Sequence, residues 1–363
     1  MRTWWTRALA VLREMEVIPL QPNADCYNHL LNFLVQENKL KMAESLYSQM
    51  RSVRVQPNAK TFNILIKGLC KASQMDPALD LLKQMSSHHG LVPKADTYNT
   101  LIRGFIKRGR MEEALELWKG MNSTGCIPTN MTYNALLHGF CNQGRVDEAT
   151  RLLEEMSGTG LYPDTVTFNI LINGFCKAND PDRAMDLLDK MMQDGFKPDV
   201  FTYNTLISGL SRIGKFHEAR TLLDEMVKKN CVPDVVTYNS MINAMCKEGK
   251  DGKLDDMVKF TDDMLARGCI PDNVTYNVLI LRLCREGKLY RTMRLLREMQ
   301  AKGCYPDSVT YNTVIDGLCK QGRVEDAEVL FGEMDNHGVV ATLITYNSLI
   351  DGLCRAGRVE GSN

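Results

Sequence analysis

The chain has 363 residues, more than one compact hydrophobic core usually supports, so several domains or a repeat array is expected. Its 44 Lys and Arg residues balance 44 Asp and Glu residues, so the strongly basic composition that favours a nucleic-acid partner is absent. No run of 18 or more apolar residues occurs, and no membrane-spanning helix is expected.

The first 23 residues fit the second helix of a partial repeat. They lack the apolar core of a secretory signal, and Glu14 and Glu16 make the segment a poor transit peptide. We expect that the chain is a fragment of a longer array, because no polar capping helix is visible at either end, and that its ends can self-associate.

A Tyr-Asn or Phe-Asn dipeptide then recurs ten times, at intervals of 35 to 38 residues. Taking this Asn as the fifth residue, we divide the chain into nine full repeats and a truncated tenth, 343–363. The full repeats are 24–58, 59–94, 95–129, 130–164, 165–199, 200–234, 235–272, 273–307 and 308–342. Three extra residues in repeat 235–272, Asp251 to Lys253, are placed in the turn between its helices.

Each repeat predicts two helices. Apolar residues at helical spacing are followed by a Gly- or Asn-containing break, a second amphipathic stretch, and a Pro that ends the repeat. The break carries Gly at Gly109, Gly144, Gly214, Gly249, Gly287, Gly322 and Gly357. Because one hairpin cannot bury its apolar face alone, we predict an all-α fold, a right-handed α-solenoid superhelix of tandem helical hairpins.

Residue types that recur at other fixed positions of the repeat indicate what the helices pack against. A Gly in the middle of most first helices, as at Gly139 and Gly317, predicts the close approach of a neighbouring helix. A Met recurs at one position of the second helices, called here the Met column, and we interpret it as part of the hydrophobic core. The cysteines fall mainly in two repeat positions without Cys-x-x-Cys, and the six histidines share no register, so we expect no metal, no cofactor and no enzymatic activity.

The repeat resembles the pentatricopeptide repeat of the pure 35-residue P class, and the 34-residue tetratricopeptide repeat fits less well. In repeat 130–164 the resemblance is carried by Thr132-Tyr133-Asn134, Leu136, Gly139, Cys141, Gly144-Arg145, Glu148-Ala149, Glu155-Met156 and Pro163-Asp164. It implies an organelle RNA-binding factor, chiefly of plants, that acts in RNA processing, stability or translation. The expected location is the mitochondrion, with the chloroplast as the alternative.

The resemblance also implies that each repeat selects one RNA base through its fifth and last residues. In this chain these are Asn28, Asn58, Asn63, Asn99, Thr129, Asn134, Asp164, Asn169, Asp199, Asn204, Asp234, Asn239, Asp272, Asn277, Asp307, Asn312, Thr342 and Asn347. Asn with Asp favours uracil, so the expected target is roughly Y-N-Y-U-U-U-U-U-Y. Two alternatives stay open: the Asn caps or turns the first helix, and the last-residue Asp caps the next helix.

Apolar second residues are expected to sandwich the bases, at Met131, Val166, Phe201, Val236, Val274, Val309 and Ile344. Asp25, Lys60 and Asp96 depart from this pattern and predict weak base reading in the first three repeats. Basic thirteenth residues are expected to contact phosphate, or simply to suit the helix dipole, at Lys71, Lys107, Lys177, Arg212, Lys247, Arg285, Lys320 and Arg355. Acidic residues early in the second helices predict a separate acidic stripe. The competing function is a protein-binding scaffold.

Overall fold

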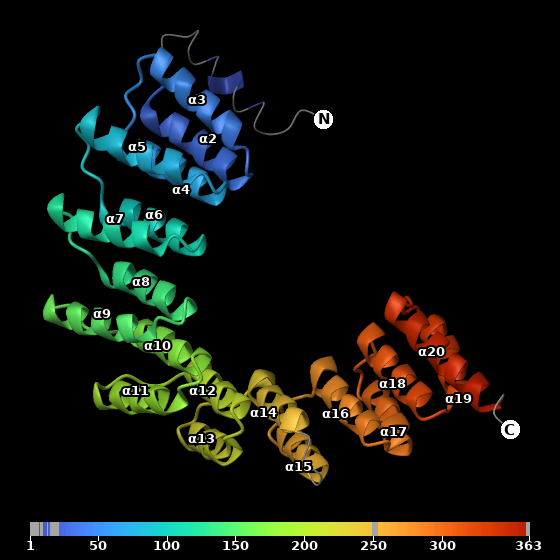
Figure 1. Cartoon of the computed structure of the whole chain (residues 1–363). Helices are drawn as coiled ribbons and strands as arrows, with labels where there is room; N and C mark the ends of the chain where they lie inside the picture. The colour runs from blue at the N-terminus through green and yellow to red at the C-terminus, as the bar shows by residue number, and fades with distance from the viewer. Residues whose placement is uncertain (1–6, 8–9, 13, 15–21, 249–252, 361–363) are drawn as a thin grey trace. The chain divides into compact units, whose positions relative to one another are not determined.

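The structure, a computed structural model, describes residues 7, 10–12, 14, 22–248 and 253–360. Their regular secondary structure is entirely α-helical, and the helices pair into hairpins (Figure 1). Most of residues 1–23, the predicted partial repeat, and residues 249–252, which include the predicted insertion at Asp251 and Gly252, lie outside the described residues. None of the described helices combines the length and apolar character that a membrane span requires.

The chain divides into two compact parts, residues 1–178 and 179–363. In the first part, each of the first four first helices packs against its own second helix and against the next first helix. The first helices are α2 (Ala24–Gln36), α4 (Ala59–Lys71), α6 (Ala95–Lys107), α8 (Asn130–Asn142) and α10 (Thr165–Lys177). The second helices are α3 (Leu40–Ser52), α5 (Met75–Ser87), α7 (Met111–Ser123) and α9 (Val146–Gly158).

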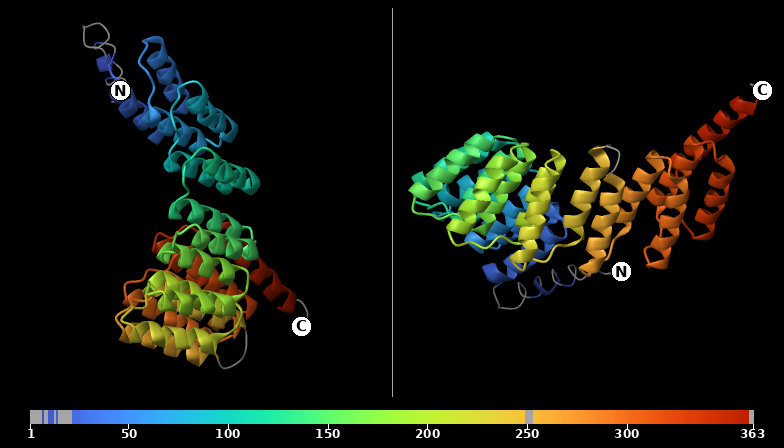
Figure 2. Two further views of the ribbon diagram at one scale, coloured as in Figure 1. Left: turned by 90° about the vertical axis from the view of Figure 1, so that its left-hand side faces the viewer. Right: turned by 90° about the horizontal axis from the view of Figure 1, so that it is seen from below.

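The second part has the same local plan, and its hairpins stack in chain order in two further views (Figure 2). Its first helices are α12 (Val200–Arg212), α14 (Val235–Glu248), α16 (Asn273–Arg285), α18 (Ser308–Lys320) and α20 (Leu343–Glu360). Its second helices are α11 (Pro181–Gln193), α13 (Phe216–Lys228), α15 (Lys253–Ala266), α17 (Leu289–Ala301) and α19 (Val324–Asn336). The predicted all-α solenoid of tandem hairpins is therefore confirmed.

The described breaks between helices follow the predicted chemistry with one exception, and the break predicted at Gly249 lies outside the described residues. Gly109, Gly144 and Gly322 have φ near +74°, the left-handed conformation in which glycine has no Cβ penalty. The prediction of a break at Gly357 is wrong, because α20 continues through it to Glu360. Among the described residues α20 has no second helix of its own repeat to pack against, so no contact folds the chain back at this glycine.

The core lies between the two helices of each hairpin and along the contacts of successive first helices. The predicted Met column is fully buried, with Met156, Met191 and Met226 at 0 % exposure. Mid-helix glycines lie where first helices approach the preceding repeat. A Cβ at Gly139 would meet Sδ of Met111 at 2.9 Å, and one at Gly317 would meet Cβ of Cys284 at 2.8 Å. These contacts are the close approach of neighbouring helices that the mid-helix glycines predict.

Two glycines of repeat 308–342 offer a matched test. Gly317→Ala should lower the free energy of unfolding, because the added methyl displaces Cys284 near its backbone, an overpacking that costs about 1–3 kcal/mol. Gly332→Ala in α19, where nothing lies within 4 Å of the added atom, should raise stability by up to about 1 kcal/mol through helix propensity. Urea unfolding of both variants measures the difference, and equal effects would contradict the close-packing explanation.

Candidate nucleic-acid interface

The fifth residue of a repeat bridges to the start of the next repeat. In repeat 130–164, Nδ2 of Asn134 donates to Oδ1 of Asp164 at 3.3 Å. The hydroxyl of Thr167, the third residue of the following repeat, lies 2.8 Å from Oδ1 of Asn134 and donates to it. Asn134 is therefore held by a hydrogen bond at each end of its amide.

We call this arrangement the seam triad: the fifth-residue Asn, the last-residue Asp, and the third-residue Thr of the next repeat. It recurs three times in the second part, in Asn204–Asp234–Thr237, Asn239–Asp272–Thr275 and Asn277–Asp307–Thr310. Two repeats use a variant with another acceptor in place of Asp. Asn312 donates to Thr342 at 3.1 Å, and Asn28 donates to Asn58 at 3.1 Å.

The last residue of the repeat is also the N-cap of the next first helix. Oδ1 of Asp272 accepts from the backbone N–H of Thr275 at 2.9 Å, and the Thr275 hydroxyl accepts from the backbone N–H of Asp272, which completes a capping box. Asp164, Asp199 and Asp307 cap in the same way. The capping role thus belongs to the last residue and not to the fifth-residue Asn.

These hydrogen bonds favour the ionised form of Asp234, Asp272 and Asp307. Burial alone would raise the pKa of Asp234, but the backbone N–H and hydroxyl of Thr237 and the amide of Asn204 outweigh it and lower the pKa below its usual value. The same balance lowers the pKa of Asp272 and Asp307. Each seam triad therefore places a negative charge beside an amide that still has hydrogen-bonding capacity.

Exposure of the fifth residues differs along the chain. Asn28 and Asn99 are buried, at 0 % and 3 % exposure, and Asn134 is at 9 %. The half-buried ones are Asn63, Asn169, Asn204, Asn239, Asn277 and Asn312, and Asn347 is exposed. An amide has two N–H groups and an oxygen with two lone pairs, and the seam triad uses one of each. In the half-buried amides that take part in a seam triad, one donor and one acceptor site remain for a ligand.

The second residues of the later repeats are apolar side chains directed into solvent. Phe201 is 57 % exposed although it is a large aromatic residue on a structured helix. The others, exposed by 46 % to 63 %, are Met131, Val166, Val236, Val274, Val309 and Ile344. Each lies three residues before the fifth-residue Asn, so it occupies the same face of the first helix one turn earlier.

Most thirteenth residues end their first helices, whereas Arg355 lies inside α20, and their environments differ. The exposed ones are Lys71, Lys107, Lys177, Arg212, Arg285, Lys320 and Arg355, whereas the side chain of Lys247 lies outside the described part. Lys320 pairs with Asp316 at 2.7 Å and Arg355 pairs with Asp351 at 2.7 Å, so these two cations are already partly neutralised. Arg212, with Ser208 and Ser240, lines an open pocket of about 430 Å³.

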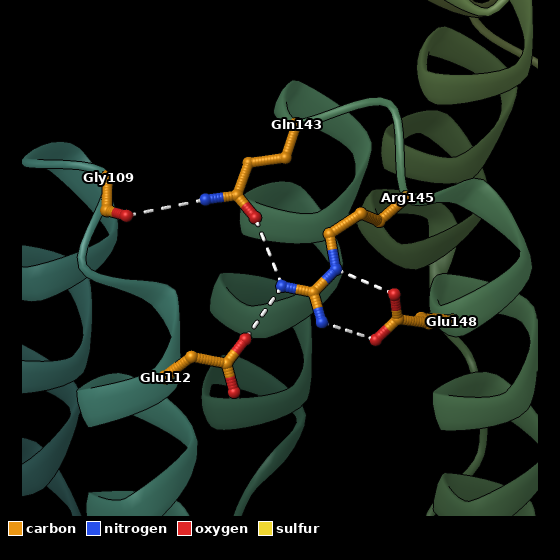
Figure 3. A network of polar contacts seen from close by, with 5 residues as sticks. All are labelled: Gly109, Glu112, Gln143, Arg145 and Glu148. Atoms are coloured by element: carbon orange, nitrogen blue, oxygen red, sulfur yellow. Dashed lines mark hydrogen bonds and ion pairs between the residues drawn. The ribbon is translucent and has the colours of Figure 1, made fainter.

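The acidic residues of the second helices form ion pairs in the part of the chain described. Arg145 contacts Glu148 of its own repeat and Glu112 of the preceding repeat, and its Nη1 also donates to Gln143 (Figure 3). The guanidinium group of Arg145 also lies over the ring of Phe140 at 4.8 Å. Lys215 joins Asp182 and Glu218 in the same way. In these repeats the acidic residues early in the second helices form ion pairs within a repeat, and Glu112 and Asp182 also pair with the following repeat.

The sequence reasoning missed the third-residue threonines. They are buried, and their hydroxyls connect the amide of one repeat to the cap of the next. Their recurrence in nine repeats was the available signal: Thr61, Thr97, Thr132, Thr167, Thr202, Thr237, Thr275, Thr310 and Thr345. A hydroxyl repeated at a buried position of a helix predicts a hydrogen-bonding role.

Comparison with known proteins identifies the family. The sequence pattern of the PPR repeat family matches most of the chain, and the pattern of the single PPR repeat matches residues 60–89. The PPR repeat family matches are at residues 22–71, 93–142, 128–177, 163–212, 198–247, 249–285, 271–320 and 306–355. The chain belongs to the PPR repeat family. No curated protein matches it.

Several solved structures are similar. The pentatricopeptide repeat protein PPR10 from maize, in complex with an 18-nucleotide psaJ RNA element, is 27 % identical over 99 % of this chain and 55 % of its own, with a TM-score of 0.49. Yeast Rmd9p, in complex with a 16-nucleotide target RNA, is 11 % identical over 96 % of this chain and 79 % of its own, with a TM-score of 0.50. The PPR domain of Arabidopsis thaliana protein-only RNase P 1, in complex with tRNA, is 20 % identical over 47 % and 89 %, with a TM-score of 0.40. The chain thus spans about half the length of PPR10.

The capping carboxyls predict an acid-sensitive stability. Their folded pKa is depressed, so their stabilisation is complete above the ordinary Asp pKa of about 3.9 and is lost as the pH falls through the folded value. The triple variant Asp234→Asn/Asp272→Asn/Asp307→Asn should be less stable at neutral pH and lose less stability below about pH 4 than the parent chain. Urea unfolding against pH measures this, and parallel acid limbs would contradict it.

Proposed function

We propose that this chain binds single-stranded RNA, with one repeat meeting one base, and prefers a U-rich site of the form Y-N-Y-U-U-U-U-U-Y. The observation that carries the proposal is the repetition of one geometry. A half-buried amide, an ionised carboxylate and an exposed apolar side chain lie together in successive repeats, as at Asn204, Asp234 and Phe201. Membership of the PPR repeat family supports it.

The chemistry of the set suits a base. The amide offers one donor and one acceptor to a Watson–Crick edge, and the neighbouring carboxylate favours a base that presents an N–H, as uracil does. An apolar side chain one turn away supplies a flat contact for the ring. Buried Asn28 and Asn99 support weaker base reading in the early repeats.

The subclass, the location and the cellular role of the chain are part of the same proposal. We assign the chain to the P class, locate it in the mitochondrion or alternatively the chloroplast, and expect it to act in RNA processing, stability or translation without cutting RNA itself. The expected self-association of the array ends belongs here as well. Sedimentation of the purified chain at several concentrations tests self-association, and recovery of intact RNA after prolonged binding tests the absence of cleavage.

Replacing one amide should affect one nucleotide. Asn204→Ser shortens the side chain and removes the amide, so preference at that base should relax or shift by about 1 kcal/mol, roughly fivefold in affinity. Asn336→Ser, at the exposed end of second helix α19, is the matched control and should change nothing. Selection from a random RNA pool measures preference at every position. An unchanged preference at all positions would contradict base reading by the fifth residue.

Removing one sandwiching side chain should weaken binding without unfolding the chain. Phe201→Ala should reduce affinity by about 1–3 kcal/mol, because base stacking is lost while the exposed side chain contributes little to the core. Val329→Ala, equally exposed on α19, is the control. Gel shifts with U-rich and A-rich RNA measure both. Equal or absent binding of the two RNAs by the parent chain would favour the protein-binding scaffold instead.

A further inference from the structure

Repeat 59–94 departs from every other full repeat where a base would be read. Its second residue is Lys60 in place of an apolar side chain, and its last residue is Lys94 in place of an acceptor. With Lys67 from about two turns further along α4, these lysines line an open pocket of about 620 Å³ between α4 and the start of α6. All three side chains are exposed.

The fifth residue of this repeat is also unlike the others. The hydroxyl of Thr97 donates to Oδ1 of Asn63 at 2.6 Å, as in a seam triad. The amide nitrogen Nδ2, however, has no hydrogen-bond acceptor among the described residues, because the ammonium group of Lys94 cannot accept a hydrogen bond. Both N–H groups of Asn63 are therefore available at the wall of the pocket.

The helix that starts at the pocket is capped differently from the others. Lys94 is the N-cap of α6 and makes no side-chain capping bond, and its carbonyl oxygen accepts from the backbone N–H of Thr97 at 2.9 Å, where Asp supplies the acceptor elsewhere. Asp96 is the one carboxylate among the lining residues, and Asp25 lies 3.9 Å from Nζ of Lys60 in an exposed ion pair, so Lys67 and Lys94 are the lining cations without a carboxylate partner among the described residues. The pocket is built of cations and donors.

We propose that repeat 59–94 holds a phosphate group of the bound RNA and reads no base. The inference rests on the proposed RNA binding. Ammonium groups and free N–H donors complement phosphate oxygens, whereas a base needs an apolar face and a mixed donor–acceptor edge. Position matters too: the ninth residue is Lys67 here, but the corresponding Asp316 and Asp351 neutralise Lys320 and Arg355 in the last two repeats. Among the described residues Lys67 and Lys94 have no such carboxylate partner, whereas Lys60 is paired with Asp25.

The test is the salt dependence of RNA binding. Lys60→Gln/Lys67→Gln/Lys94→Gln should reduce the slope of log affinity against log salt by about 2, since each lost phosphate contact on a single strand removes about 0.7. Base preference at every position should stay as in the parent chain. The matched control, Lys41→Gln/Lys83→Gln/Lys119→Gln, removes three exposed lysines from the second helices α3, α5 and α7 of this and the two adjacent repeats and should leave the slope unchanged.

The outcomes separate the inference from the function on which it rests. Absence of U-rich RNA binding by the parent chain overturns both. Binding with a parental slope in the triple variant, or a changed base preference at this repeat, overturns the phosphate site alone. RNAs with and without a 5′-monophosphate identify the source of the group. A preference for the phosphorylated end that disappears in the triple variant assigns a terminal phosphate, and equal binding with the lowered slope assigns an internal one.

A converse variant tests the same site by gain of function. Lys60→Val/Lys94→Asp returns an apolar second residue and gives Nδ2 of Asn63 an acceptor. The double variant should acquire a preference for uridine at this nucleotide while its salt slope falls by about 1.4. A thermal melt controls for folding, and stability should rise because Asp caps α6 better than Lys does.

Discussion

In four repeats the carboxylate that ends the repeat both caps the next first helix and holds the amide proposed to read a base. Oδ1 of Asp272 accepts from the backbone N–H of Thr275 in the first turn of α16 and from the amide of Asn239 in the preceding first helix. One atom therefore caps a helix and fixes the side chain of the proposed base contact. Because buried donors and acceptors must be paired, the Thr hydroxyl between the two helices is equally constrained. Register between neighbouring first helices is set at the same point where the proposed base contact is made.

This arrangement explains why the proposed reading residues can be both structural and functional. A free Asn side chain on a helix would lose rotamer entropy on binding, whereas an amide already held at both ends has lost it on folding. The half-burial of Asn204, Asn239 and Asn277 is consistent with that division, since one side of each amide faces the seam and the other remains accessible. A fully buried amide such as Asn28 keeps the structural role and has no accessible side for a base.

Much of this was predictable from the sequence because repetition averages out local ambiguity. The Tyr-Asn period set the helix starts, and the Met and Gly columns predicted core and close contact. The seam triad was not predicted, because its three members are 30 and 3 residues apart and their geometry depends on how hairpins stack. The continuation of α20 through Gly357 shows the limit of local signals: glycine permits a left-handed turn, but packing of a second helix decides whether one forms.

A net charge of zero is compatible with a polyanionic partner when the two signs are used differently. Glu112 and Asp182 pair with Arg145 and Lys215 of the following repeat, so they contribute to the association of repeats, whereas Glu148 pairs with Arg145 inside its own repeat. In repeat 59–94, Lys67 and Lys94 line an open pocket without a carboxylate partner among the described residues, and Lys60 pairs with Asp25. Exposed ion pairs contribute little individually, but unpaired cations act on a phosphate chain through counterion release. On the proposed function, mutations of the lysines in repeat 59–94 would change how tightly RNA is held without changing which RNA is chosen, whereas mutations of the fifth residues in the later repeats would change which RNA is chosen.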